Sequence, residues 1–367
     1  MLLNSVPRDA LLKPLSAVSG IVERRQTLPV LSNVLLEHKA GVLAFTATDL
    51  EIQISAKTPL DGEAPQGVTV AARKFQELLR ALPEDAVLRI EATDTKLNIK
   101  AGRSRYHLQT LPAANFPRIE TSGEQRQSLS FPQKTLRRLL HLVEFAMAQQ
   151  DVRYYLNGLL LVIEGETLIA VATDGHRLSY AATSLAGTYE RQEVIIPRKT
   201  VQELSKLLDE SDALVSLDLL ANQVRFRFSD IEVVSKVIDG KFPDYNRVIP
   251  VGYTRHIILN RVVFLQTLQR AAILANEKFR GVRLVLAAGS LRIICTNAEQ
   301  EEAEEELEID YQGADLDVGF NITYLQDVLT HLDTSEITLS FGDSGSSALI
   351  TIPERADYKY VVMPMRI

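Results

Sequence analysis

The sequence predicts an α+β protein built from three tandem copies of one domain, each with two helices packed on antiparallel sheet. Three observations lead to this prediction. One strand-and-turn motif occurs three times, helical periodicity occurs in six windows, and charge is divided unevenly between those windows and the rest of the chain. A chain of 367 residues is long enough for two or three domains of ordinary size.

The repeated motif is an apolar, strand-like segment that runs into Thr-Asp or Thr-Asn. Its copies are "VLAFTATDLE", "TLIAVATDGHR" and "SLRIICTNAEQ". The threonines are Thr48, Thr173 and Thr296, at spacings of 125 and 123 residues. A constant spacing of this size indicates a repeated structural unit.

Six windows show apolar residues at steps of three and four, which predicts amphipathic helices. They form two series in the same order, at 7–22, 132–147 and 260–275, and at 72–82, 197–208 and 320–332. Strand-like segments lie between them. Polar, turn-rich stretches near 122–128 and 250–256 mark the boundaries, so we expect domains at 1–125, 126–253 and 254–367.

The composition excludes several classes of protein. No run of 18 apolar residues predicts a membrane span, and the N-terminal stretch lacks the features of a secretory signal. The single cysteine, Cys295, lies in the apolar run "LRIIC", so we expect a buried structural thiol, no disulfide framework and a cytoplasmic protein.

The second copy of the motif contains Asp174, His176 and Arg177 within four residues, which suggests an acid–base site. Neither sibling has the His-Arg pair, so Thr-Asp is assigned to the repeated fold and Gly175–Leu178 to a feature of this copy. The chain has no nucleotide-binding, hydrolase or zinc-protease motif, and its histidines are scattered singly. An enzyme remains the alternative class, but we expect no catalytic residue, metal or cofactor.

Charge is segregated along the chain. The helical windows, extended to 7–25, 73–82, 132–150, 198–208, 260–280 and 321–332, hold 17 Lys/Arg and 7 Asp/Glu, a balance of +10. The whole chain carries −7, so the remainder carries −17. Helices gathered on one side would therefore give a basic face that suits a polyanion.

The helices lack a base-reading motif, which favours contact with the nucleic-acid backbone regardless of sequence. The alternative for each single cation is an ordinary solvated side chain. The candidate phosphate contacts in the helices are Arg73, Arg80, Arg137, Arg138, Arg198, Lys206 and Arg270.

Longer motifs point to a known family. "QQDVRYYLNG", "VATDGHRL", "SKVIDGKFPDY", "NEKFRGVRL", "NAEQEEAEEE" and the terminal "YVVMPMRI" resemble the bacterial DNA polymerase III beta subunit, the sliding-clamp family, and most of all its proteobacterial members. The resemblance covers the whole chain. It implies a non-catalytic processivity factor, a head-to-tail homodimer that closes six clamp-type domains around duplex DNA, and a separate clamp loader that uses ATP.

The resemblance implies a ring interface between the first domain of one copy and the third domain of another. "EQEEAEEELEID" is strongly acidic and "KAGRSRYHL" is basic, as such an interface requires, although a solvated loop is the alternative for the acidic run. The implied residues are Lys74, Leu78, Arg103, Arg105 and Leu108 on one side, and Ile273, Leu274, Glu301, Glu302, Glu304 and Glu305 on the other.

The resemblance also implies contacts with double-stranded DNA at the mouth of the ring. Aromatic side chains there could stack on exposed bases, with core packing as their alternative. The implied residues are Arg25, Gln150, Tyr154, Tyr155, Lys199 and Phe279, and Lys278 flanks the last of them.

A third implied site is an apolar groove for short peptides that begin with glutamine and end in leucine and phenylalanine. The implied partners are the polymerase III catalytic subunit, the clamp loader, translesion and repair polymerases and mismatch-repair proteins. A buried last strand is the alternative for the apolar C-terminus. The implied groove residues are Leu156, Thr173, Gly175, His176, Arg177, Leu178, Pro243, Arg247, Val248, Val361, Met363, Pro364 and Met365, with Asn321, Tyr324, Ser347 and Arg366 nearby.

Besides an enzyme, a second alternative function is that of a static DNA-binding protein. It predicts tight, steeply salt-dependent binding to linear duplex, whereas a ring predicts weak binding there and retention on circular duplex.

Overall fold

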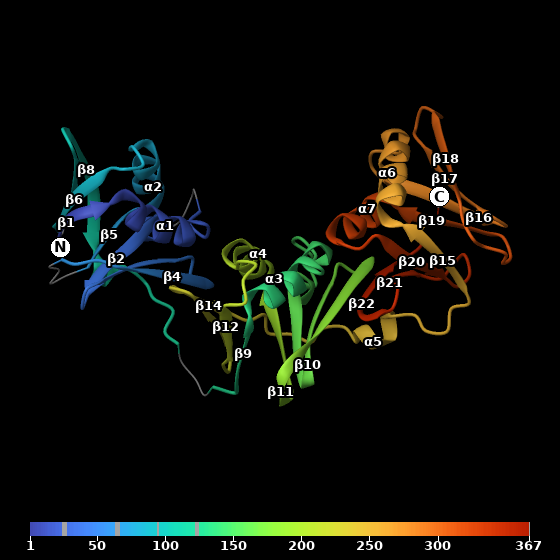
Figure 1. The fold of residues 1–367 in the computed structure, drawn as a ribbon, viewed down its shortest axis with the longest axis horizontal. Helices are drawn as coiled ribbons and strands as arrows, with labels where there is room; N and C mark the ends of the chain where they lie inside the picture. The colour runs from blue at the N-terminus through green and yellow to red at the C-terminus, as the bar shows by residue number, and fades with distance from the viewer. Residues whose placement is uncertain (24–27, 63–66, 94, 122–124, 367) are drawn as a thin grey trace. The chain divides into compact units, whose positions relative to one another are not determined.

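A computed structural model describes residues 1–23, 28–62, 67–93, 95–121 and 125–366. It divides into two compact units, Met1–Arg137 with Gln202–Val237, and Arg138–Val201 with Ile238–Ile367. Helices and antiparallel strands occur in both units, which confirms the predicted α+β class (Figure 1).

The first unit contains one large sheet. Its strands are β1 (Leu2–Pro7), β2 (Asn33–Lys39), β3 (Val42–Thr48), β4 (Ile52–Pro59), β5 (Val68–Ala71), β6 (Val87–Ala92), β7 (Lys96–Ala101), β8 (Ser104–Pro112), β9 (Gln127–Pro132), β12 (Leu214–Leu219), β13 (Gln223–Phe228) and β14 (Ile231–Lys236). They follow the order β1-β6-β7-β8-β5-β2-β3-β4-β14-β13-β12-β9.

The second unit contains two sheets. Their strands are β10 (Gly158–Thr173), β11 (Arg177–Pro197), β15 (Arg255–Asn260), β16 (Gly281–Ala287), β17 (Ser290–Thr296), β18 (Glu302–Glu308), β19 (Leu316–Asn321), β20 (Glu336–Phe341), β21 (Ala348–Ile352) and β22 (Arg355–Val362). One sheet has the order β10-β11-β22-β21-β20-β15 and the other β18-β17-β16-β19.

Helices form in all six predicted windows. They are α1 (Arg8–Ser19), α2 (Ala72–Ala81), α3 (Gln133–His141), α4 (Arg198–Leu207), α6 (Arg261–Ala271) and α7 (Ile322–His331). The four-residue helix α5 (Tyr245–Val248) was not predicted, because one turn is too short to give a periodic signal.

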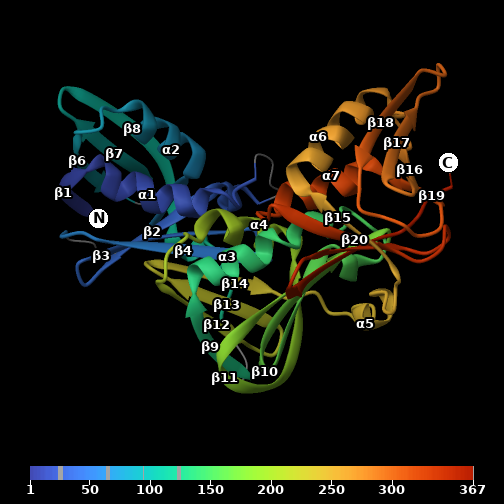
Figure 2. The ribbon, with the colours of Figure 1, turned by 45° about the vertical axis from the view of Figure 1, so that its right-hand side comes forward.

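The helices pack in pairs over their sheets. Helix α1 lies beside α2, and α6 lies beside α7, in two views of the molecule (Figures 1 and 2). Helix α1 buries Leu11, Leu15 and Val18, and α2 buries Phe75 and Leu79. These i, i+4 and i+3 stripes are the reason that the amphipathic segments fold onto the sheet as helices.

The strand order shows the repeat directly. The series β1-β6-β7-β8, β9-β12-β13-β14 and β15-β20-β21-β22 have the same connectivity, with one helix after the first strand and another before the second. The predicted threefold repeat is therefore confirmed.

Successive repeats are joined by strand pairing. Strand β4 of the first repeat pairs with β14 of the second, with Ile52 opposite Ser235. Strand β11 of the second repeat pairs with β22 of the third, with Arg177 opposite Val362. The boundary between the compact units therefore cuts through the middle repeat, since each of its half-sheets continues into a neighbour.

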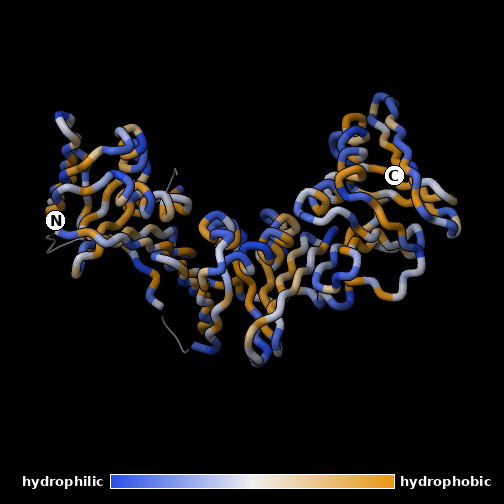
Figure 3. Tube along the Cα trace, in the orientation of Figure 1, coloured by the Kyte–Doolittle hydropathy of each residue, from blue (hydrophilic) through white to orange (hydrophobic). Residues whose placement is uncertain are grey.

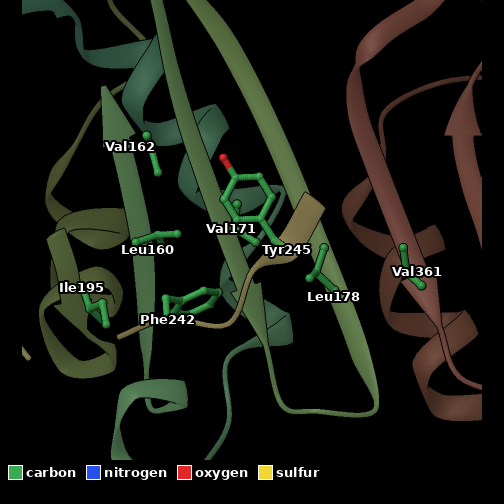
Figure 4. Close-up of a cluster of buried hydrophobic side chains, with 8 residues drawn as sticks. All are labelled: Leu160, Val162, Val171, Leu178, Ile195, Phe242, Tyr245 and Val361. Carbon is green, nitrogen blue, oxygen red and sulfur yellow. The ribbon is translucent and has the colours of Figure 1, made fainter. Parts of the chain in front are cut away.

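Strands β10 and β11 carry a buried apolar cluster on one face. Leu160, Val162 and Val171 of β10 are at most 3% exposed. The rings of Phe242 and Tyr245, from the segment that includes α5, lie over them (Figure 4). Along the chain trace, most strand segments are orange and most turns are blue or white (Figure 3). No helix in the described ranges is long and apolar enough to span a membrane.

A buried carboxylate ties three strands of the large sheet together. Asp218 of β12 is fully buried, accepts a hydrogen bond from the Ser128 hydroxyl at 2.7 Å, and pairs with Arg225 at 2.7 Å and Arg227 at 3.0 Å. Burial tends to raise the pKa of Asp218, but the hydrogen bonds from Ser128 and Arg225 outweigh it and hold this pKa below its ordinary value.

We predict that Asp218→Asn lowers the free energy of unfolding by about 1–3 kcal/mol at pH 7, because it weakens charge-assisted bonds in a buried place. A carboxylate whose pKa is lowered by folding stabilises the protein above its unfolded pKa, about 3.9, and loses this effect as pH falls through the folded pKa. The difference between variant and wild type should therefore narrow below about pH 4. Urea unfolding followed by circular dichroism measures it.

Asp212→Asn is the control, since Asp212 is exposed and forms a surface ion pair with the exposed Lys134. It should cost less than about 1 kcal/mol. If the difference in the free energy of unfolding between wild type and Asp218→Asn stayed constant or widened in acid, the assignment of a lowered pKa to Asp218 would be contradicted.

Candidate partner-peptide and nucleic-acid interfaces

The Thr-Asp motif forms the same turn in the first two repeats. The hydroxyl of Thr48 donates to the Ile52 carbonyl at 2.9 Å, and that of Thr173 donates to the Arg177 carbonyl at 2.5 Å. One oxygen of Asp49 accepts from the backbone N–H groups of Glu51 and Ile52, and Asp174 does the same for the two equivalent groups.

The third copy uses its asparagine in this way. Asn297 Oδ1 accepts from the backbone N–H groups of Glu299 and Glu301, at 3.0 and 2.9 Å. The turn is one residue longer than its siblings. These bonds occupy Thr173 and Asp174 in holding the turn, so the assignment of Thr-Asp to the repeated fold is confirmed.

Arg177 joins the second repeat to the third. Its guanidinium pairs with Asp174 at 3.1 Å and with Asp327 of α7 at 2.6 Å, and donates to the Phe145 carbonyl at 2.7 Å. It also lies 4.3 Å from the centre of the Tyr324 ring. Burial opposes its charge, yet Tyr360, Asp327 and Asp174 around it raise the pKa of Arg177 above its ordinary value. Arg177 thus remains a cation and holds the turn against α7.

The C-terminal segment is held on both sides. The Met363 N–H donates to the His176 carbonyl, and the Met365 N–H donates to the Gly319 carbonyl, both at 2.9 Å. The first bond ties the segment to the Thr-Asp turn and the second ties it to β19. Met363 keeps 48% of its surface exposed in this position.

The groove residues implied by sequence separate into two groups. One group reaches the surface: Gly175, His176, Pro243, Arg247, Val248, Ser347, Met363, Pro364, Met365 and Arg366. The other serves the fold. Leu156, Leu178 and Val361 are about 1% exposed, so in this structure they support the surface from below. Asn321 caps α7, accepting from the N–H groups of Thr323 and Tyr324.

A hollow of about 350 Å³ lies beside Arg177. Its lining shares His176, Arg177 and Tyr324 with the groove residues and adds residues that the sequence did not indicate, Phe145, Met147, Ala148, Gln149 and Asp151. Arg198 also lines it and donates to the Met147 carbonyl at 2.8 Å. The arginines that bind these carbonyls are far away in sequence, so no local signal could have identified the hollow.

The loop before β10 exposes polar and apolar side chains together. Gln150 has a left-handed backbone, with φ of 54°, and Val152 is 96% exposed. A hydrogen bond from the Arg153 side chain holds the pKa of Asp151 at about 2. Tyr154 is 57% exposed and meets Tyr155 edge to face. Phe279, in another loop, is 59% exposed, which removes core packing as its explanation.

The residues implied to contact DNA differ in whether their charged groups already form ion pairs or hydrogen bonds inside the chain. No ion pair involves Arg80 or Arg138 within the described residues, and both are exposed. Arg137 pairs with Glu210, and Lys206 with Glu203. Arg73 donates to the Val22 carbonyl, Lys199 is half-buried, and Arg25 lies outside the described residues.

The charge of Arg270, a candidate phosphate contact, is paired inside the chain. Its guanidinium forms a bidentate pair with Glu305, at 2.8 and 2.6 Å. Glu305 is an implied residue of the dimer interface and Arg270 a candidate DNA contact, and within the chain each neutralises the charge of the other. The pair was not visible in the sequence because the residues are 35 positions apart, on α6 and β18.

The implied interface residues are accessible on both sides. Lys74, Arg103, Arg105, Glu301, Glu302 and Glu304 are exposed, and Leu78, Leu108 and Leu274 are half-buried. Ile273 is 78% exposed, which is unusual for a large aliphatic side chain.

Comparison with known proteins agrees with this architecture. The models of the N-terminal, central and C-terminal domains of the DNA polymerase III beta subunit match residues 3–120, 130–244 and 246–366. The chain is 48% identical to the beta sliding clamp of Pseudomonas putida and 43% identical to that of Escherichia coli K12, each over 99% of both chains.

Solved structures agree as well. The DNA polymerase III subunit beta of Pseudomonas aeruginosa is 46% identical, with a TM-score of 0.96 over 100% of both chains. A sliding clamp from the same organism bound to griselimycin is 47% identical, also with a TM-score of 0.96 over 100% of both. The chain therefore belongs to the DNA polymerase III beta-subunit family, the non-catalytic DNA sliding clamps.

Proposed function

We propose that two copies of this chain close head to tail into a ring around duplex DNA, with repeats at 1–125, 126–253 and 254–367. In the cytoplasm, the ring tethers polymerase III and, in turn, the clamp loader, other polymerases and mismatch-repair proteins. The proposal rests on two strand edges of opposite charge. Each of them lacks a hydrogen-bonded partner strand, among the described residues, along at least part of its length.

Each end of the chain has one such edge. Strand β18, the third-repeat equivalent of β4 and β11, ends its sheet, and of the described strands only β17 pairs with it. Strand β8, the first-repeat equivalent of β14 and β22, pairs with β7 over Ser104–Gln109 and has no described strand on its other side there. A β18·β8 pair between two copies would repeat the junctions inside the chain and close by rotation.

The junction between the first and second repeats gives the register of this pair. Ile52, where the turn closes, lies opposite Ser235, four residues after β14 begins. The equivalent residues are Glu301, which closes the Asn297 turn, and Leu108, four residues after β8 begins. Glu301 opposite Leu108 places Glu302, Glu304 and Glu306 opposite His107, Arg105 and Arg103. Cross-strand pairs of opposite charge stabilise such a ladder.

Helix ends supply an apolar contact next to this ladder. Inside the chain, Gly20 at the end of α1 lies against Glu203 of α4, and Phe145 after α3 stacks on His331 of α7 at 4.3 Å. Ile273 is the equivalent residue after α6 and is exposed. Its partner in the other copy is α2, where Leu78 occupies the position of Glu203.

We predict that Arg105→Glu raises the dimer dissociation constant at least about tenfold, or about 1.4 kcal/mol, because it opposes Glu304 with a like charge. Sedimentation measures the constant. Glu304→Arg added to Arg105→Glu should restore most of the affinity. Glu308→Lys, which lies beyond the first residue of β8 in this register, should not. Equal rescue by both second changes would refute the register.

We predict that rings loaded on circular duplex stay bound when salt is raised, whereas binding to linear duplex disappears, because the ring holds DNA by topology and not by phosphate contacts. Gel filtration of labelled protein on each DNA measures retention. Equal loss from both forms would favour the static DNA-binding alternative.

The surface group of groove residues is the proposed partner site, with His176 and Met363 at its centre. Methionine side chains adapt to different apolar partners, which suits a site used by several proteins in turn. The bonds of Met363 and Met365 to His176 and Gly319 fix the backbone of the segment while leaving these side chains free to adapt.

We predict that Met363→Ala with Met365→Ala weakens binding of a peptide that begins with Gln and ends in Leu-Phe by about tenfold, because the two changes remove apolar contact area. Fluorescence polarisation measures the peptide affinity. Val251→Ala is the control, since Val251 is 89% exposed outside this group. Unchanged affinity in the double variant, with the dimer intact, would place the peptide elsewhere.

A further inference from the structure

The three repeats do not share basic charge equally. Helices α1, α2 and α3 carry Lys13, Lys74, Arg80 and Arg138, none of which forms an ion pair within the described residues. Helix α7 has no Lys or Arg, and α6 has only Arg261 and Arg270. The basic balance of the six helical windows therefore comes mainly from the first two repeats.

Both cations of α6 are engaged inside the third repeat. Arg261 donates to the carbonyls of Thr334 and Leu329, at 2.6 and 2.7 Å, and so binds the end of α7. Arg270 forms its bidentate pair with Glu305 and donates to the Thr267 hydroxyl. A guanidinium already matched to a carboxylate has little net charge to offer a phosphate.

Neutral side chains replace the missing cations. The buried stripes of α3 and α6 begin at Leu136 and Phe264, so Lys134 and Arg138 correspond to Val262 and Gln266. Val262 is 43% exposed and its neighbour Val263 is 47% exposed. On α7 the exposed residues are Thr323 and Thr330.

The loop after α6 carries two free cations of the third repeat. Lys278 and Arg280 are exposed, and neither forms an ion pair within the described residues. Asn276 Oδ1 accepts from the N–H groups of Lys278 and Phe279, both at 3.0 Å, which fixes the loop. The Lys278 ammonium lies 5.4 Å from the centre of the Phe279 ring.

We infer that α6 and α7 make no contact with DNA phosphates, and that the loop 276–280 supplies the phosphate contacts of the third repeat in their place. The free cations of α1, α2 and α3 supply the remaining attraction. The inference rests on the proposed ring, because it assumes that these helices face the duplex. It reassigns Arg270 from a DNA contact to an internal pair.

The test is the salt dependence of equilibrium binding to a short linear duplex, measured by fluorescence anisotropy. Removing one phosphate-binding cation should reduce the slope of log K against log salt by about 0.9. Arg80→Gln with Arg138→Gln should reduce the slope, and so should Lys278→Gln with Arg280→Gln. Arg270→Gln with Glu305→Gln removes a cation without changing net charge and should leave the slope unchanged.

A reduced slope in the Arg270/Glu305 variant, with the dimer intact by sedimentation, would overturn the inference. An unchanged slope in the Lys278/Arg280 variant would overturn it as well. Binding to a short linear duplex does not require topological retention. If the wild-type protein were not retained on circular DNA at raised salt, the proposed ring would be rejected. That outcome is distinct from the salt slopes, which test the contacts of the third repeat.

Discussion

Antiparallel strand pairing between successive repeats is the interaction on which the rest of this structure depends. Strand β4 pairs with β14, and β11 pairs with β22, so each repeat extends the sheet of the next. A sheet edge is a row of unpaired backbone groups and a template for another strand. Here two edges are filled inside the chain, while β18 and β8 retain the equivalent edges.

The same pairing positions the proposed partner site. Because β11 lies against β22, the Thr-Asp turn at the start of β11 meets the chain just after β22, and the His176 carbonyl receives the Met363 N–H. Arg177 then secures the turn to α7 through Asp327. Asp174 and Arg177, two of the residues that first suggested acid–base chemistry, thus serve the fold, since their side chains are committed to the turn and to α7.

Local features of this fold could be predicted from the sequence. The six helices follow from apolar spacing, and the turn follows from side chains that bond their own backbone, since both signals lie within a few residues. Long-range partners could not. The burial of Leu178 and Val361 depends on β11 meeting β22, and the neutralisation of Arg270 depends on β18 lying near α6. The lack of Lys and Arg in α7 is visible in the sequence, but the pairing that removes Arg270 from the free cations is not.

Cysteine cross-linking tests most directly the central claim that the junctions inside the chain are the template for the junction between copies. The one native cysteine, Cys295, is buried, and burial raises its pKa to about 11, so it should not interfere. Opposite residues of an antiparallel pair lie close enough for a disulfide. Arg105→Cys with Glu304→Cys should give covalent dimers on oxidation, and the slipped pair Tyr106→Cys with Glu304→Cys should not. Equal cross-linking of both pairs, or none in the first, would contradict the account.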